Sequence, residues 1–275
     1  MTDLAGREWR LIREEARDGP TNMALDEIAA ETAAAGGPRT VRVYRWDPST
    51  LSLGYHQDPE TIDWDVCERE GITVTRRPTG GGAIYHDVDA DVSYSIVAPA
   101  DELPGDLMDC YELLCRPVLE AFERLGVAAG FADAERPALH EPACYLRQLH
   151  PAHDVVGPDG RKVSGNAQYR QRDSVIQHGS LSYDLVPERH LATFADPGVA
   201  PARFRDRVGA ITEYADPSRA EAVRTVEETL AAWVDADEGE WTDDELRRAR
   251  ERAREKYASA AWTRERIDPT DAETA

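Results

Sequence analysis

The stretch RRPTGGGAIYHD, residues 76–87, holds three consecutive glycines directly after an arginine pair and Pro-Thr. Glycine loses more backbone freedom on folding than any other residue, so a loop without a task would seldom keep Gly80, Gly81 and Gly82 together. Such a run lets backbone N–H groups approach an anion closely. The stretch matches neither a Walker A sequence nor GxGxxG, which excludes a P-loop and a Rossmann phosphate site.

The two arginines of this stretch indicate what the loop could bind. Arg76 and Arg77 can grip a carboxylate or a phosphate through forked hydrogen bonds. The alternative is a tight turn with two surface arginines and no ligand.

A second informative stretch is GRKVSGNAQ, residues 160–168. Its Lys162 is one of only two lysines in a chain that otherwise uses arginine, which suggests a place where a compact ammonium matters. Cys144 precedes it, and a thiol is a useful nucleophile only as a thiolate, which a nearby ammonium favours. The alternatives are a lysine in a surface hairpin and a buried structural cysteine.

Composition limits the classes of partner. The chain has 275 residues and a formal net charge of −21. This acidity excludes a protein that binds nucleic acid mainly through its phosphates, and also docking on an anionic membrane. Excess carboxylate with scarce lysine suggests a surface adapted to high salt. The Debye length at 1 M salt is only ~3 Å, so a net charge of −21 would cause little repulsion within the protein there. An ordinary acidic mesophilic enzyme is the alternative.

Residue patterns predict an α+β protein, because strands and helices mix without a regular βαβ order. The predicted helices are 22–35, 62–69, 107–125, 220–234 and 243–257, and the predicted strands are 40–46, 50–54, 72–75, 83–85, 92–97, 155–156, 162–167 and 175–183. Thr242 is the expected N-cap of the last helix. Residues 217–267 are the expected closing helices, and 268–275 a frayed tail.

The N-terminus and the cysteines favour a cytoplasmic setting. Residues 1–15 are charged and lack the apolar core of a secretory signal, and no stretch approaches the roughly 18 apolar residues of a membrane span. The four cysteines show no CxxC spacing, so we expect reduced thiols and neither a disulfide framework nor a metal site. We interpret His150 and His153 as solvated.

Together these motifs resemble the lipoate–protein ligase and octanoyltransferase family, which shares its catalytic domain with biotin–protein ligases. The segments that carry the likeness are NMALDE at 22–27, YRW at 44–46, LSLG at 51–54, RRPTGGGAIYHD at 76–87, KVSGNAQ at 162–168, HG at 178–179, and KY at 256–257 with Trp262. The resemblance implies a single catalytic domain over 1–267. Its fold is then a mixed, largely antiparallel sheet flanked by helices, related to class II synthetase and biotin-ligase domains.

The resemblance also implies roles for residues and partners. Arg76 and the backbone of Gly80–Gly82 would face the acyl or acyl-phosphate head, and Lys162 would stabilise charge that builds in the transition state. The further residues expected to bind substrate are Arg77, Tyr85, His86, Gly165, Asn166 and His178. The acceptor would be a lysine of a lipoyl-domain protein, either a 2-oxoacid dehydrogenase acyltransferase subunit or the glycine-cleavage carrier. We expect a monomer.

Two mechanisms fit this family. A cysteine octanoyltransferase takes an acyl group from a carrier thioester onto its own thiol and needs no cofactor; Cys144 resembles that nucleophile. A ligase uses ATP and Mg²⁺ to form a lipoyl-adenylate, with no covalent enzyme intermediate. A non-catalytic relative that binds lipoate is a third hypothesis.

Overall fold

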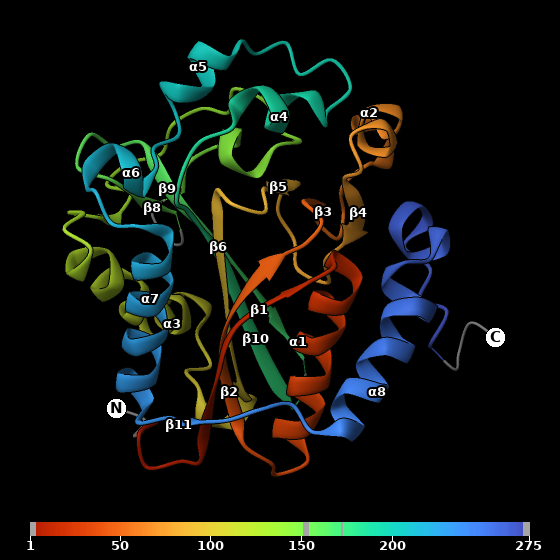
Figure 1. Ribbon diagram of the computed structural model, residues 1–275, viewed down its shortest axis with the longest axis vertical. Helices are drawn as coiled ribbons and strands as arrows, with labels where there is room; N and C mark the ends of the chain where they lie inside the picture. Colours follow the sequence, from red (N-terminus) through yellow and green to blue (C-terminus); the bar gives the residue numbers. More distant parts are fainter. Residues whose placement is uncertain (1–3, 151–153, 172, 272–275) are drawn as a thin grey trace.

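The centre of the molecule is an eight-stranded sheet with the order β11-β1-β2-β6-β10-β9-β8-β7 (Figure 1). The computed structural model describes residues 4–150, 154–171 and 173–271. The strands are β1 (Trp9–Arg17), β2 (Arg39–Trp46), β6 (Asp91–Pro99), β7 (Gly130–Phe131), β8 (Val155–Val156), β9 (Lys162–Arg170), β10 (Ser174–Ser182) and β11 (Asp237–Glu238). Neighbours from β2 to β7 pair antiparallel, whereas β11, β1 and β2 run parallel. The predicted mixed, largely antiparallel sheet is confirmed.

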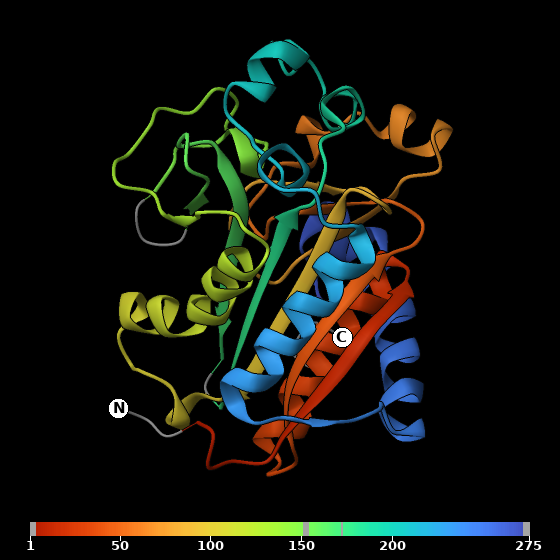
Figure 2. The same ribbon diagram turned by 60° about the vertical axis from the view of Figure 1, so that its left-hand side comes forward.

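Helices cover both faces of this sheet. α3 and α7 pack on one face, and α1 and α8 on the other (Figures 1 and 2). Their bounds are α1 (Gly19–Ala34), α3 (Leu107–Arg124), α7 (Arg219–Val234) and α8 (Asp243–Arg252). Alternate residues of a strand point to opposite faces. β2 therefore gives Val41 and Val43 to the core under α3 and α7, and Tyr44 and Trp46 to the core under α1 and α8.

A smaller sheet with the order β4-β3-β5 lies at one end of the molecule and has its own apolar core. Its strands are β3 (Thr50–Leu53), β4 (Thr73–Arg76) and β5 (Ile84–His86). The short helices are α2 (Trp64–Arg69), α4 (Pro187–Ala192), α5 (Pro201–Arg205), α6 (Ile211–Tyr214) and the 3₁₀ helices Pro59–Thr61, Ala100–Glu102 and Cys144–Leu146. The glycine run joins β4 to β5, so this sheet holds the loop that the sequence singled out.

Local chemistry explains where the helices begin. Thr242 caps α8 as predicted, since its side chain accepts a hydrogen bond from the Glu245 backbone N–H. α1 begins earlier than predicted, because Asp18 accepts from the backbone N–H of Thr21 and Pro20 suits a first helical turn. Among the described residues, no helix combines the length and the apolar character that a bilayer crossing requires.

The C-terminal segment differs from the prediction in two respects. The α-helix ends at Arg252 and continues as the π-helical turns Ala253–Tyr257 and Ala261–Glu265. Asp268, expected in a frayed tail, lies 2.6 Å from the buried Lys256 ammonium, which anchors this part of the tail.

β1 is a strand that the sequence analysis did not predict. Its first four residues are buried, and Trp9, Leu11 and Ile12 among them are apolar. The segment is charged from Arg13 to Glu15 and loses the alternation of a strand. Its place depends on backbone pairing with β2 on one side and β11 on the other.

Candidate active site

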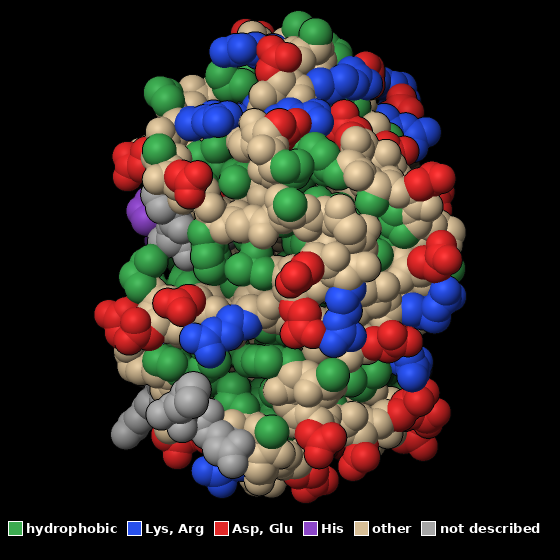
Figure 3. Space-filling view, turned by 90° about the vertical axis from the view of Figure 1, so that its left-hand side faces the viewer, with side chains coloured by type: hydrophobic (Ala, Val, Ile, Leu, Met, Phe, Trp, Pro, Cys, Tyr) green, Lys and Arg blue, Asp and Glu red, His purple; other side chains and the backbone are tan. Residues whose placement is uncertain are grey.

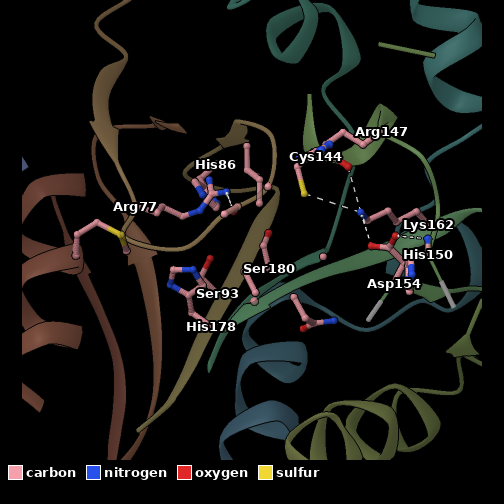
Figure 4. Close-up of a pocket in the computed structure, with 18 of the residues that line it drawn as sticks. Arg77, His86, Ser93, Cys144, Arg147, His150, Asp154, Lys162, His178 and Ser180 are labelled. Atoms are coloured by element: carbon pink, nitrogen blue, oxygen red, sulfur yellow. Dashed lines mark hydrogen bonds and ion pairs between the residues drawn. The ribbon is translucent and has the colours of Figure 1, made fainter. Parts of the chain in front are cut away.

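A cavity of ≈ 360 Å³ lies between the small sheet and the central sheet (Figure 4). This volume is in the usual range for a small-molecule site. Its apolar and aromatic lining residues are Met23, Tyr44, Trp46, Ile84 and Ala167. Its polar and glycine lining residues are Arg77, Gly80, Gly81, His86, Ser93, Glu141, Cys144, Arg147, Gln148, His150, Asp154, Lys162, Gly165, Asn166, His178, Gly179 and Ser180.

Cys144 and Lys162 meet in the wall of this cavity (Figure 4). Lys162 Nζ lies 3.9 Å from Cys144 Sγ and donates a hydrogen bond to the Cys144 carbonyl at 3.1 Å. Asp154 Oδ1 lies 2.6 Å from the same nitrogen. Burial disfavours the charge on Lys162, but Cys144 and Asp154 outweigh it, so the pKa of Lys162 is raised. The site therefore keeps an ammonium beside the sulfur.

The glycine loop holds the cysteine segment in place. Ala83 N–H donates to the Pro142 carbonyl at 2.7 Å, and Cys144 N–H donates to the Ala83 carbonyl at 2.8 Å. A Cβ on Gly82 would lie 2.6 Å from the Pro142 oxygen and 2.8 Å from the Cys144 nitrogen. Only glycine therefore permits this close approach of the two backbones.

Arg77 is buried and clamps the glycine loop from inside. Its Nη2 donates to the carbonyl oxygens of Gly80 and Gly82 at 3.2 and 2.9 Å. Its Nη1 donates to the carbonyl and the hydroxyl of Ser52 at 2.6 and 2.8 Å, and its Nε to the Thr79 hydroxyl at 3.2 Å. A guanidinium has five N–H donors, and these contacts occupy them.

Arg76 does not line the cavity, which corrects its predicted contact with the acyl head. The side chain is fully buried, and it donates to the carbonyl oxygens of residues 54, 55 and 57 and of Thr263. The guanidinium of Arg76 therefore donates its hydrogen bonds to backbone carbonyl oxygens and not to the carboxylate or phosphate that the sequence analysis predicted. The physical reason is that buried backbone carbonyl oxygens need hydrogen-bond donors, and a guanidinium supplies five of them.

His178 lines the cavity at the end of a chain of buried polar groups. Its Nε2 lies 2.8 Å from Thr79 Oγ1, and its Nδ1 lies 3.5 Å from Asp26 Oδ2. Asp26 is itself paired with Arg42 at 2.9 Å. Burial lowers the pKa of His178 although Asp26 opposes this, so the imidazole is neutral at pH 7.

His86 has a similar environment on the other side of the same network. Its Nε2 lies 2.8 Å from Ser52 Oγ, and its Nδ1 lies 2.6 Å from Asp91 Oδ2. The ring stacks on Trp46 with a centroid distance of 4.1 Å. Burial lowers the pKa of His86 against the effect of Asp91. Both imidazoles thus give the cavity polar but uncharged walls.

The other predicted site residues are divided between this cavity and its surroundings. Gly165 and Asn166 line it from β9, and a Cβ on Gly165 would lie 3.4 Å from Cys144 Sγ. Tyr85 faces a separate small pocket, where its hydroxyl donates to Asp87 at 3.1 Å. Gly82 lines an adjoining groove instead.

Two features of the cavity escaped the sequence analysis. Asp154 was not a candidate, although it directly precedes β8, the neighbour of the lysine strand β9. His150 is exposed, in agreement with its interpretation as solvated, but it also lines the cavity, whereas His153 lies outside the described residues. Within the described ranges, no group of three or more His, Cys, Asp or Glu residues is placed to hold a metal ion.

Two solved structures share this arrangement of sheet and helices. A bipartite lipoate–protein ligase from Thermoplasma acidophilum superposes with a TM-score of 0.77 at 24% identity, covering 95% of this chain and 98% of that one. A lipoate–protein ligase A bound with ATP superposes with a TM-score of 0.76 at 24% identity, covering 94% and 100%. These likenesses establish the fold.

Sequence comparison then gives the family. The lipoyl protein ligase A/B catalytic domain matches residues 18–232. The octanoyltransferase LipM of Anoxybacillus flavithermus is 32% identical over 278 residues, 92% of this chain and 97% of that protein. The LipM of Kyrpidia tusciae is 36% identical over 207 residues, 73% and 74% of the two chains. The chain therefore belongs to the lipoyl protein ligase A/B catalytic domain family, as its motifs predicted.

Proposed function

We propose that this enzyme transfers an octanoyl group from a carrier thioester to a lysine of a lipoyl-domain protein, through a thioester on Cys144. The observation that carries the proposal is the Lys162 ammonium 3.9 Å from Cys144 Sγ in the wall of the cavity. A cation at this distance stabilises the negative charge on an attacking sulfur, which nucleophilic catalysis by cysteine requires. The octanoyltransferase relatives at 32% and 36% identity support the same activity.

The first half-reaction moves the acyl group to the enzyme. The Cys144 thiolate attacks the thioester carbonyl of the donor, a new S–C bond forms, and the carrier's C–S bond breaks. Lys162 gives its proton to the departing carrier thiolate, so the carrier leaves as a thiol and Lys162 becomes neutral.

The second half-reaction delivers the acyl group. Neutral Lys162 takes one proton from the acceptor's lysine ammonium, and the free amine attacks the Cys144 thioester. The amide C–N bond forms, the S–C bond breaks, and the second proton of the amine passes to water. The thiolate and the Lys162 ammonium are thereby restored.

The apolar part of the cavity wall suits an uncharged acyl chain. Trp46, Tyr44 and Met23 supply apolar surface, and His86 and His178 are neutral at pH 7. A chain that carries no charge loses little solvation free energy in such a site. This supports an acyl group as the ligand, with the reacting carbonyl at the Cys144 end.

The second candidate is the ATP-dependent ligase, in which Mg²⁺ and ATP would form an acyl-adenylate. Arg76 and Arg77 were the residues expected to hold a phosphate, and both donate to protein acceptors instead. Both guanidinium groups are therefore already engaged by the protein, and we infer that the transferase needs no cofactor.

We also infer several properties of the protein as a whole. They are a single catalytic unit over 1–267, a monomeric state, a cytoplasmic location, a surface adapted to high salt and no nucleic-acid partner. The non-catalytic alternative is disfavoured because the cysteine, the lysine and the glycine loop all meet at one cavity.

Intact-mass spectrometry tests the proposal directly. Wild-type protein incubated with an octanoyl-carrier thioester gains one octanoyl group, and adding a lipoyl domain removes it without ATP. Cys144→Ser gains none, and Lys162→Ala forms the adduct slowly or not at all. The matched control is Cys67→Ala, which removes a buried thiol that does not line the cavity and should leave the adduct unchanged. Full ATP-dependent activity with lipoate in Cys144→Ser would overturn the transferase.

A further inference from the structure

We propose that Asp154 is a positioning residue, which aims the Lys162 ammonium at Cys144 and makes Lys162 the base for the acceptor amine. This inference rests on the proposed function. No pattern in the sequence marks Asp154.

Each N–H of the Lys162 ammonium has one acceptor. Asp154 Oδ1 lies at 2.6 Å, the Cys144 carbonyl oxygen at 3.1 Å and Cys144 Sγ at 3.9 Å (Figure 4). An ammonium has three rotatable donors, and the two oxygen contacts fix its rotation. The third proton then points at the sulfur. Without the carboxylate, one oxygen contact remains and the rotation is free.

Asp154 is itself rigidly placed. Its side chain and that of Lys162 are each 4% exposed. Its Oδ2 accepts the backbone N–H of His150 at 2.8 Å, and its carbonyl accepts from Ala132 N–H at 3.0 Å. The strand β8 that follows it pairs with β9, where Val155 lies opposite Ser164. The carboxylate is therefore held by backbone contacts that do not involve Lys162.

The other groups that face Lys162 cannot take over this role. Arg207 accepts the Lys162 backbone N–H at 2.9 Å through its carbonyl, and its guanidinium opposes the ammonium charge. The Tyr145 ring lies 5.5 Å from Nζ, and His150 lines the same cavity. Asp154 is the carboxylate in contact with Lys162 among the described residues.

The Asp154 carboxylate affects proton transfer by Lys162 differently in the two half-reactions. A carboxylate beside Lys162 makes it a stronger base and a weaker acid. In the second half-reaction Lys162 must take a proton from an ammonium whose ordinary pKa is about 10.4, and this step needs the stronger base. In the first half-reaction Lys162 gives a proton away. Losing the carboxylate costs the ammonium its orientation toward Cys144 but makes it a stronger acid, so the two effects oppose each other and the rate of this step changes less. Asp154 should therefore matter most after the acyl-enzyme has formed.

Asp154→Asn tests this, because it removes the charge at nearly constant volume. With octanoyl-carrier thioester, we expect the variant to form the Cys144 adduct at a rate within a few-fold of wild type. Transfer to a lipoyl domain at pH 7 then slows by on the order of 10²-fold, at the low end of what general base catalysis supplies. Raising the pH restores transfer, because the acceptor amine then arrives already deprotonated. The observable is an acyl-enzyme that persists at pH 7 and discharges at alkaline pH.

Two further variants separate positioning from folding. Asp154→Glu keeps the charge and should recover part of the transfer rate. Asp159→Asn removes a carboxylate from the same hairpin, where it pairs with Arg161 at 2.8 Å outside the cavity, and should leave both half-reactions unchanged. The inference is overturned if the Asp154→Asn variant transfers the acyl group as fast as wild type. It is also overturned if the folded variant loses both half-reactions equally at every pH. If wild-type protein itself forms no Cys144 adduct, the proposed function has failed, and this inference fails with it.

Discussion

Replacing Glu245 with glutamine should destabilise the protein in a way that depends on pH. Glu245 joins α8 to the central sheet through two hydrogen bonds from Arg10, at 2.9 and 2.6 Å, with side chains 6% and 9% exposed. Thr32 of α1 donates a third at 2.9 Å, and the Thr242 backbone a fourth at 2.9 Å. Glutamine keeps the shape but leaves the Arg10 charge buried without a counter-ion.

The pKa of Glu245 gives the magnitude. Burial raises it, but the hydrogen bonds from Arg10 and Thr242 and the Arg10 charge outweigh this and lower it from 4.5 to about 2. A shift of this size corresponds to about 3 kcal/mol of unfolding free energy at neutral pH. Because the pKa is lower in the folded state, this stability is present above pH 4.5 and is lost as the pH falls through 2. About 1.4 kcal/mol of it is gone by pH 3.5.

Urea unfolding at several pH values measures this difference. Wild type and Glu245→Gln should differ by about 3 kcal/mol at pH 7, and the gap should narrow between pH 4.5 and 3.5. Glu251→Gln is the matched control, since Glu251 pairs with Arg247 on the exposed face of α8 and such pairs contribute at most about 1 kcal/mol. Two curves that stay parallel from pH 7 to 3.5 would refute the assignment of a lowered pKa to Glu245.

Two further outcomes follow from the loop and from the surface. Gly82→Ala should slow formation of the Cys144 adduct by roughly 10²-fold in intact-mass measurements, because its Cβ would lie 2.8 Å from the Cys144 nitrogen and would push that backbone away. Gly105→Ala is the control: its Cβ meets nothing within 4 Å, so this variant should form the adduct at the wild-type rate. Molar KCl should raise the urea midpoint, because acidic side chains are spread over the face shown in Figure 3 and salt screens the repulsion within a chain of net charge −21. Equal midpoints in dilute buffer and molar KCl would refute the proposed adaptation to high salt.

Some of the fold could be predicted because the signals are local. The alternation in 40–46 and the Thr242 cap depend on neighbours in sequence, and both appear in the structure as expected. β1 depends instead on pairing with β2 and with the distant β11, and its charged second half hides the strand pattern. Local signals cannot identify an element that long-range pairing creates.

The arginine pair shows a similar limit at the candidate site. Sequence indicates that two guanidinium groups lie beside a glycine loop, but the direction in which they point depends on distant acceptors. Arg76 donates to the carbonyl of Thr263, 187 residues away, which becomes available only after the C-terminal turns pack on the small sheet. The contact between Asp154 and Lys162 could not be predicted for a related reason, since it depends on the pairing of β8 with β9.

The contrast between Arg77 and Lys162 explains why a chain so poor in lysine keeps one at this point. Arg77 presents a planar fork whose donors meet acceptors fixed by the loop backbone, and the result is a rigid support. Lys162 must divide its donors between a carboxylate, a carbonyl and a sulfur that lie in different directions. In the proposed mechanism Lys162 also gives up and regains a proton in each cycle, which a guanidinium cannot do near neutral pH. Arginine at 162 would therefore preserve the charge and lose the proton transfer, so acyl-enzyme formation and discharge would both fail even if the ion pair with Asp154 survived.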